Sequence, residues 1–235
     1  MMLARTLFTA ALLALGACTT PATAPDVPNA PDAQGTGDWH AVPLPGKDST
    51  RYEWGHKDGR AAWCATSERS ASMWRRHVNV AAESVGEVSF SWWVQDIIAN
   101  ANVAEAHLED APARVMFAFG GDVRSLPVRT RMLFDLTEAL TGERPPFATL
   151  IYVWDATAPV GSVIINPRSD RIRKIVVDSG PTELRRWRLH RRDLAADFRL
   201  AFGESPGPLT AIALMTDSDN TQSSAQSWYG AVDLH

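Results

Sequence analysis

Near its C-terminus the chain has a polar turn between two apolar segments. The side chains of this turn could bind a metal ion or a ligand. Asp217, Asp219 and Asn220 bring carboxylate and amide oxygens into one short stretch. Hard cations such as calcium take several oxygens of this kind, and the same groups can accept hydrogen bonds from sugar hydroxyls. Short polar side chains also bond to neighbouring backbone in ordinary turns. A plain turn, a calcium site and a direct ligand contact therefore all remain open.

Tryptophans form a second set of candidates. The chain contains nine of them, and a flat indole ring can pack against the apolar face of a sugar. Trp93 lies on the polar side of an alternating segment, whereas Trp154 and Asp155 stand at the end of an apolar one. We predict that these three residues bind a ligand together with the terminal turn. The alternative is that the rings belong to the core, where tryptophan is usually found.

The segment 168–192 is rich in arginine, although the whole chain has a net charge of −4. If residues 185–192 form a strand, Trp187 and Leu189 are expected to point inward, with Arg186, Arg188 and Arg192 outward. This basic patch could dock an anionic envelope component, such as a phospholipid or glycolipid headgroup. Alternatively, the arginines pair with the acidic remainder of the chain. The acidic balance and the expected export argue against nucleic acid as a partner.

No motif identifies a catalytic site. The chain lacks the nucleophile elbow, the zinc-binding helix, the phosphate loop and the dinucleotide fingerprint, and we assign no catalytic residue. His107 with Glu109 and Asp110 is the local acid–base cluster. A glycan hydrolase needs two facing carboxylates about 5–10 Å apart, and neighbouring residues of a strand point to opposite faces. A hydrolase using another acid pair stays as a further alternative. We expect no cofactor, and calcium at the terminal turn is the alternative to that expectation.

The segments that must position these residues are mostly strands. Residues 87–94 alternate between apolar and polar, and residues 147–155 are almost continuously apolar, as in a strand buried on both faces. Helices are expected at 129–140, with Met132, Leu133, Leu136 and Leu140 on one stripe, and at 191–202. Many short strands with two short α-helices predict a mainly β fold, a jelly-roll-like β-sandwich. Further strands are expected at 60–67, 113–120, 161–166, 171–178, 209–216 and 227–234.

The N-terminal sequence predicts where in the cell the protein is located. Residues 1–17 combine a short cationic start with an apolar segment, which is typical of a secretory signal. The segment ends in Leu15-Gly16-Ala17-Cys18, which resembles the bacterial lipobox, so Cys18 is the expected lipidation site. Residues 18–38 are rich in proline and alanine and predict a disordered tether. Residues 39–235 then form the β-sandwich domain.

Several stretches of this domain carry a family resemblance. "DAPARVMFAFGGD", "LIYVWD", "RKIVVDSG" and the segment from Arg191 to Gly230 resemble the bacterial domain-of-unknown-function family 3047. That family has no settled activity, and its pattern is similar to galactose-binding-like jelly rolls, which include many carbohydrate-binding modules. The resemblance implies a jelly roll and hints at ligand binding.

Together these features predict a lipid-anchored protein of the cell envelope. Thr19 after the lipobox cysteine suggests the outer membrane. The expected role is non-catalytic binding of a glycan-type ligand by the β-sandwich. An interaction or structural lipoprotein that docks an anionic component through its basic patch is the alternative.

Overall fold

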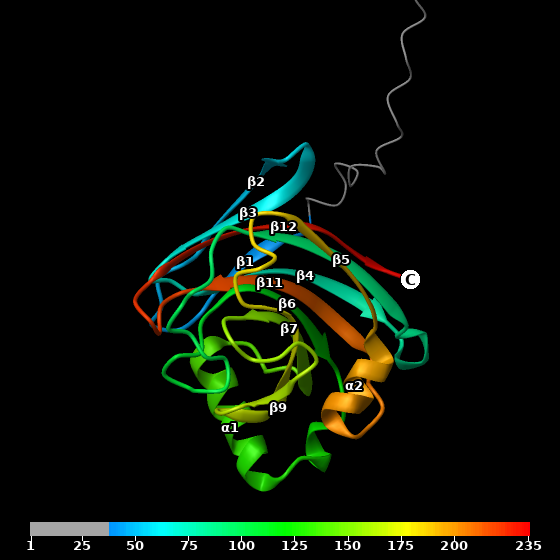
Figure 1. The fold of residues 1–235 in the computed structure, drawn as a ribbon. Helices are drawn as coiled ribbons and strands as arrows, with labels where there is room; N and C mark the ends of the chain where they lie inside the picture. Colours follow the sequence, from blue (N-terminus) through cyan, green and yellow to red (C-terminus); the bar gives the residue numbers. More distant parts are fainter. Residues whose placement is uncertain (1–37) are drawn as a thin grey trace, which may run out of the picture.

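The computed structural model describes residues 38–235 and shows a β-sandwich made of two sheets (Figure 1). Sheet A has seven strands, in the spatial order β1 (His40–Pro43), β4 (Ser72–Val80), β11 (Leu209–Asp217), β6 (Ala111–Phe119), β7 (Ala148–Asp155), β9 (Ser169–Ser179) and β8 (Val163–Asn166). Sheet B has five, in the order β10 (Trp187–Asp193), β5 (Glu87–Val94), β12 (Ser224–Leu234), β3 (Arg60–Glu68) and β2 (Arg51–Lys57). Neighbouring strands are antiparallel except β7 and β9, which run parallel. The predicted jelly-roll-like sandwich is therefore confirmed.

Alternation along the strands builds the core between the sheets. On β5, Val88, Phe90, Trp92 and Val94 are all buried and belong to the main core cluster, as the sequence predicts. The facing strand β7 contributes Tyr152, whose ring stacks on Phe90 at 5.4 Å. All eight residues of β7 are buried, because segments outside the sandwich also cover its outer face.

Two α-helices flank the sheets in the part of the chain that the structure describes. Helix α2 (Leu194–Phe202) begins after Asp193, whose carboxylate accepts a hydrogen bond from the backbone N–H of Ala196, and ends at Gly203. It packs Phe198 against Phe119 of sheet A, with 4.6 Å between the ring centroids. Short 3-10 turns, η2 (Ala82–Ser84) and η3 (Val123–Ser125), lie in the connections.

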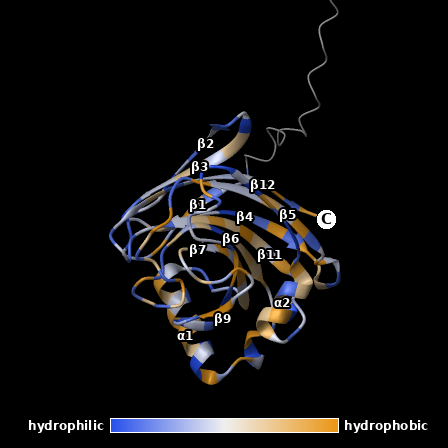
Figure 2. Ribbon diagram, viewed as in Figure 1, coloured by the Kyte–Doolittle hydropathy of each residue, from blue (hydrophilic) through white to orange (hydrophobic). Residues whose placement is uncertain are grey.

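Helix α1 (Val128–Thr141) does not bury the stripe expected from its sequence. Met132, Leu133, Leu136 and Leu140 are all exposed, and Phe134 is the buried residue of the helix. The helix lies at the edge of the molecule, outside the two sheets, and its apolar residues are coloured orange in Figure 2. A stripe of this kind usually faces a core, but here it is exposed, because no sheet lies against that side of α1.

Strand β10 also has the opposite orientation to the expected one. Leu189 is 74% exposed, whereas Arg188 and His190 turn inward and bond to the buried carboxylate of Asp178. Arg192 reaches Asp197 in the same way. The polar side of β10 faces inward because Asp178 of β9 and Asp197 of α2 provide buried acidic partners on that side. The sequence pattern of β10 alone cannot show this.

The predicted signal peptide (residues 1–17), the expected lipidation site Cys18 and residues 19–37 of the predicted tether lie outside the described residues. Within residues 38–235, no helix has the length and apolar character needed to cross a membrane.

Candidate functional site

The terminal polar turn joins β11 to β12 and is held by an acid from a distant loop. Asp110 precedes β6, and its carboxylate accepts hydrogen bonds from the backbone N–H of Asn220 at 3.1 Å and of Thr221 at 2.7 Å. The hydroxyl of Thr221 adds a third bond at 2.6 Å. Asp110 is buried, so its charge is compensated by donors of the turn.

Three carboxylates meet beside this turn. One oxygen from each of Asp110, Asp217 and Asp219 lies within 4.8 Å of the others, so the buried triad could hold a metal ion. The side-chain amide of predicted Asn220 instead donates to the carbonyl of Ala106 at 2.9 Å.

Cations of the chain already contact this triad. Arg114 lies 3.1 Å from Asp217, and the ammonium group of Lys47 contacts Asp219. A calcium ion takes six to eight oxygens, and here one carboxylate is engaged by Lys47 and another by the turn. A metal at this position would have to displace Lys47.

Burial and repulsion within the triad change the protonation of Asp217. Burial raises its pKa, Asp110 and Asp219 add to the rise, and Arg114 opposes it, which leaves the pKa at about 7. Asp217 also accepts a hydrogen bond from the backbone N–H of Ala111 at 3.1 Å. These contacts tie β11 to the start of β6.

Trp154 and Asp155 do not lie beside the terminal turn at the surface. Trp154 is fully buried and donates its indole N–H to the carbonyl of Gly180 at 3.1 Å. Asp155 is also buried, and its carboxylate accepts hydrogen bonds from backbone N–H groups of Val103, Thr157 and Ala158. In this structure both residues organise the end of β7 and offer no open surface.

Trp93 lies on the outer face of sheet B, opposite the core-facing residues of β5. It pairs in register with Trp228 of β12 on one side and Trp187 of β10 on the other. Directly opposed residues in an antiparallel pair lie on the same face, so the three indoles form a row across the sheet. Trp93 is nevertheless only 6% exposed, and the ammonium group of Lys57 lies 3.8 Å from its ring centroid.

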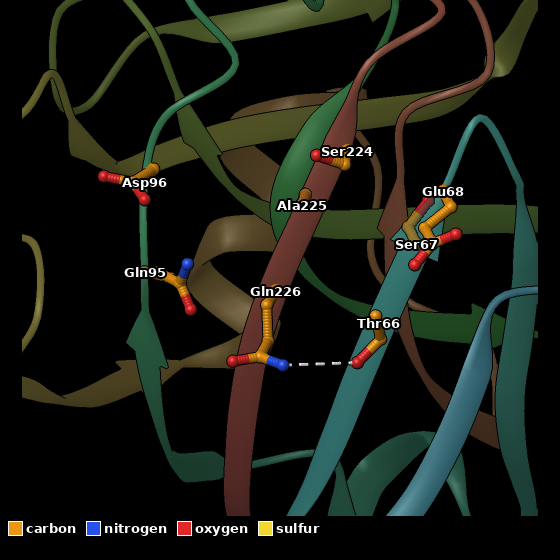
Figure 3. A pocket seen from close by; sticks show the side chains of 8 residues that line it. All are labelled: Thr66, Ser67, Glu68, Gln95, Asp96, Ser224, Ala225 and Gln226. Carbon is orange, nitrogen blue, oxygen red and sulfur yellow. Dashed lines mark hydrogen bonds between the residues drawn. The ribbon is translucent and has the colours of Figure 1, made fainter.

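A hollow of polar side chains lies next to this tryptophan row on the same face. Gln226 of β12 stands opposite Thr66 of β3, and its amide donates to the Thr66 hydroxyl at 3.4 Å. Gln95 follows β5 and donates its backbone N–H to the carbonyl of Gln226 at 3.1 Å. Figure 3 shows Gln95 and Asp96 on one side of this hollow and Thr66 and Glu68 on the other, with Gln226 and Ser224 between them.

The hollow has a volume of about 340 Å³ and a lining of carboxylate, amide and hydroxyl groups. Alternation places Gln226 and Trp228 on the same face, two residues apart, and does the same for Gln95 and Trp93. We call this surface, defined by Thr66, Glu68, Gln95, Asp96, Ser224 and Gln226, the polar hollow. Sequence reasoning missed the polar hollow. The available signal was that Gln95 lies two residues after Trp93 and is therefore expected on the same face of the strand.

The arginines of the predicted basic patch have acidic partners within the fold. Arg188 bonds to Asp178 and to Glu183, both at 3.0 Å, and Arg192 bonds to Asp197 at 2.7 Å. Arg186 is more exposed and lies 3.3 Å from Glu183. Internal pairing, which was the alternative to an anionic partner, therefore occupies all three.

The acids near His107 are also separated from one another. His107 is exposed, and its Nε2 atom lies 3.7 Å from Glu105. Glu109 is buried against Lys174 at 2.7 Å and accepts a hydrogen bond from Asn166 at 2.6 Å. Burial lowers the pKa of Lys174, and the Arg114 charge lowers it further, to about 8, although Glu109 opposes this. The cluster joins the 96–110 loop to the outer face of sheet A.

The fold and the surface describe a β-sandwich with polar and aromatic rows on one outer face. The chain belongs to the family described as "Protein of unknown function (DUF3047)", which it matches over residues 37–233. No curated protein matches the chain.

Solved structures of similar fold have low sequence identity. A family 11 carbohydrate-binding module from Clostridium thermocellum, in complex with a β-1,3-1,4-mixed-linked tetrasaccharide, is 10% identical with a TM-score of 0.44, covering 87% of this chain and 92% of that one. The family 11 module of the cellulosomal cellulase Lic26A-Cel5E, also from Clostridium thermocellum, is 8% identical with a TM-score of 0.41, covering 84% and 86%. The xyloglucanase domain of NopAA from Sinorhizobium fredii, in complex with cellobiose, is 7% identical with a TM-score of 0.38, covering 83% and 99%.

Proposed function

We propose that this protein is a lipid-anchored component of the cell envelope, in the outer membrane, whose β-sandwich binds a glycan without catalysis. The observation that carries the proposal is the polar hollow beside the tryptophan row on the outer face of sheet B. Thr66, Gln226 and Gln95 supply a hydroxyl and two amides from adjacent strands. Such groups both donate and accept hydrogen bonds, which suits sugar hydroxyls.

The charge of the hollow favours a neutral or hydroxyl-rich ligand. Glu68 and Asp96 contribute carboxylates, which accept hydrogen bonds from hydroxyl groups and repel anions. Arg185 lies 2.8 Å from Asp96 and compensates that charge. An anionic headgroup has no free cationic cluster to bind here, so we favour a glycan over the anionic component that was the alternative.

The experiment compares two glutamines of the full-length protein purified in detergent. A panel of neutral oligosaccharides is screened for binding, and affinities are measured by calorimetry. Gln226→Ala removes an amide from the hollow and is expected to weaken binding about threefold to tenfold. Gln222→Ala is the matched control, because Gln222 lies in the terminal turn and bonds to the Asp219 carbonyl.

Two results would reject the proposal. One is that no oligosaccharide of the panel binds. The other is that Gln226→Ala and Gln222→Ala bind equally well, which would place the ligand elsewhere.

A further inference from the structure

The tip of the β2–β3 hairpin extends beyond the rest of sheet B. Strand β12 pairs with β3 only as far as Tyr229 opposite Trp63, whereas β2 and β3 remain paired to the pair Lys57 and Arg60. Residues 55–62, which we call the hairpin arm, are therefore paired only with each other. Asp58 and Gly59 at the tip both have positive φ angles, 51° and 79°, as in the tight turns that close two-residue hairpins.

The hairpin arm folds over the tryptophan row. Besides the contact of Lys57 with Trp93, the guanidinium carbon of Arg60 lies 5.4 Å from the ring centroid of Trp187. The indole N–H of Trp187 donates to the carbonyl of Lys57 at 3.1 Å. The hydrophilic tip is the blue end of the raised hairpin in Figure 2.

Gly55 lets the hairpin arm lie close to the sheet. A side chain at Gly55 would begin 3.4 Å from the ring of Trp228. The contacts between arm and sheet include one hydrogen bond and two cation–π contacts, and Ala62 at the base of the arm is fully buried. The polar contacts at the tip are individually weak, and the arm is not paired with β12, so its tip is attached less firmly than a strand inside the sheet.

Two indole N–H groups under the hairpin arm lack an acceptor. The Nε1 atoms of Trp93 and Trp228 are buried and have no hydrogen-bond partner within residues 38–235. Buried donors are nearly always satisfied in folded proteins, so each exception needs an explanation, and a functional role is one of them. Here both belong to the row that continues the polar hollow.

We propose that the hairpin arm is a movable cover over an aromatic glycan subsite formed by Trp93, Trp187 and Trp228. This inference rests on the proposed function and extends it. When the arm lifts, the indoles become a platform for the apolar faces of pyranose rings, and their free N–H groups donate to sugar oxygens. The platform and the polar hollow are two residues apart along each strand, a distance of about 7 Å. The ligand class is therefore a chain of at least two pyranose rings that spans both parts.

The test removes the cation that lies on Trp93. In the full-length protein, Lys57→Ala favours the open arm and is expected to tighten binding of the oligosaccharide at least about threefold, because a closed population reduces apparent affinity. It is also expected to increase quenching of tryptophan fluorescence by acrylamide without ligand. Trp228→Phe keeps an aromatic ring but removes the free N–H, and it should weaken binding about fivefold. His56→Ala, on the opposite face of the arm, is the matched control and should change neither.

The possible outcomes separate this inference from the proposed function. If Gln226→Ala weakens binding while Lys57→Ala and Trp228→Phe bind as the wild type does, the glycan site stands and the covered subsite is rejected. Weaker binding by Lys57→Ala would also overturn the cover, because Lys57 would then be a ligand contact. Binding confined to single monosaccharides, with no gain for longer chains, would contradict the two-ring ligand class.

Discussion

The Oδ2 atom of Asp178 lies 2.8 Å from the Nε2 atom of His190, and the same oxygen accepts a hydrogen bond from the indole of buried Trp92. Arg188 bonds to the other carboxylate oxygen. This acid therefore ties β9 and β10 to the core strand β5. It also explains why the basic side of β10 faces inward.

We expect Asp178→Ala to lower the free energy of unfolding at pH 7 by about 3 kcal/mol, because it leaves buried donors without a partner. Burial by itself would raise the pKa of Asp178, but hydrogen bonds from His190, Trp92 and Arg188 lower it below its ordinary value. A carboxyl group with a lowered folded pKa stabilises the fold above about pH 3.9 and loses this contribution as the pH falls through the folded pKa. Denaturant titrations across pH 2–7 measure both effects.

Glu183→Ala is the control for this prediction. Glu183 is the partly exposed partner of Arg188, and its substitution should change the free energy of unfolding by at most about 1 kcal/mol. An equal loss in both variants would contradict the central role of Asp178.

Asp217 should produce a pH dependence of the opposite sign. Its raised pKa of about 7 means that the folded protein holds a proton which the unfolded chain releases near pH 4. The associated stability is fully present below about pH 4 and is lost as the pH rises to about 7. Asp217→Asn cannot titrate, so the difference in unfolding free energy between wild type and variant should vary across this window and level off above it. A difference that stays constant from pH 4 to 8 would show that Asp217 is ionised throughout.

Lys47 should determine whether the carboxylate triad binds calcium. In the wild type its ammonium group already contacts Asp219, so neither calcium nor a chelator should shift the melting temperature. Lys47→Ala frees that carboxylate, and calcium should then stabilise the variant by mass action. Thermal melts with millimolar calcium or EDTA make the comparison. A chelator-sensitive wild type would mean that a metal, and not Lys47, balances the triad.

Trp154→Phe is expected to affect stability and leave binding unchanged. The substitution removes the hydrogen bond to Gly180 and leaves space in the core, at a cost of about 2 kcal/mol. Oligosaccharide affinity, measured well below the melting temperature, should equal that of the wild type. A variant that keeps its stability but loses affinity would show that Trp154 contacts the ligand, as the sequence analysis predicts.

Cys18→Ser should release the protein from membranes if a lipid on this cysteine anchors it. Fractionation of cells into soluble and membrane parts, with immunodetection, gives the result. Cys64→Ser is the matched control, because Cys64 is buried in the sandwich. Retention of Cys18→Ser in the outer membrane would show that another contact holds the protein.

The local sequence pattern predicts much of this fold. It does not predict features that depend on contacts with residues far away in the sequence. The alternation of β5 assigns its core face correctly because that pattern is contained in eight consecutive residues. Strand β10 is just as regular, but its two faces can be told apart only by Asp178 and Asp197, which arrive from other elements. The apolar stripe of α1 has the period of a buried helix, and only the position of the sheets shows that it is exposed.

The candidate site shows the same division. The sequence selects Asp217 and Asp219 as neighbours, and the structure adds Asp110, more than a hundred positions earlier in the chain. Trp93 is recognised from alternation, whereas its row with Trp187 and Trp228 depends on the register of three strands. Strand order is set by non-local pairing, so a local pattern could not reveal that row. Strands β1, β2 and β4 were also missed, since β1 has only four residues and charged residues interrupt the apolar ones of β2 and β4.

The position of β12 makes sheet B depend on a single strand. β12 lies between β5 and β3 and is the strand that joins the pair β10–β5 to the pair β2–β3. Until β12 is in place, these two pairs have no strand in common. The polar hollow and the tryptophan row both take residues from β12, so neither can exist in a partly folded sheet that lacks it.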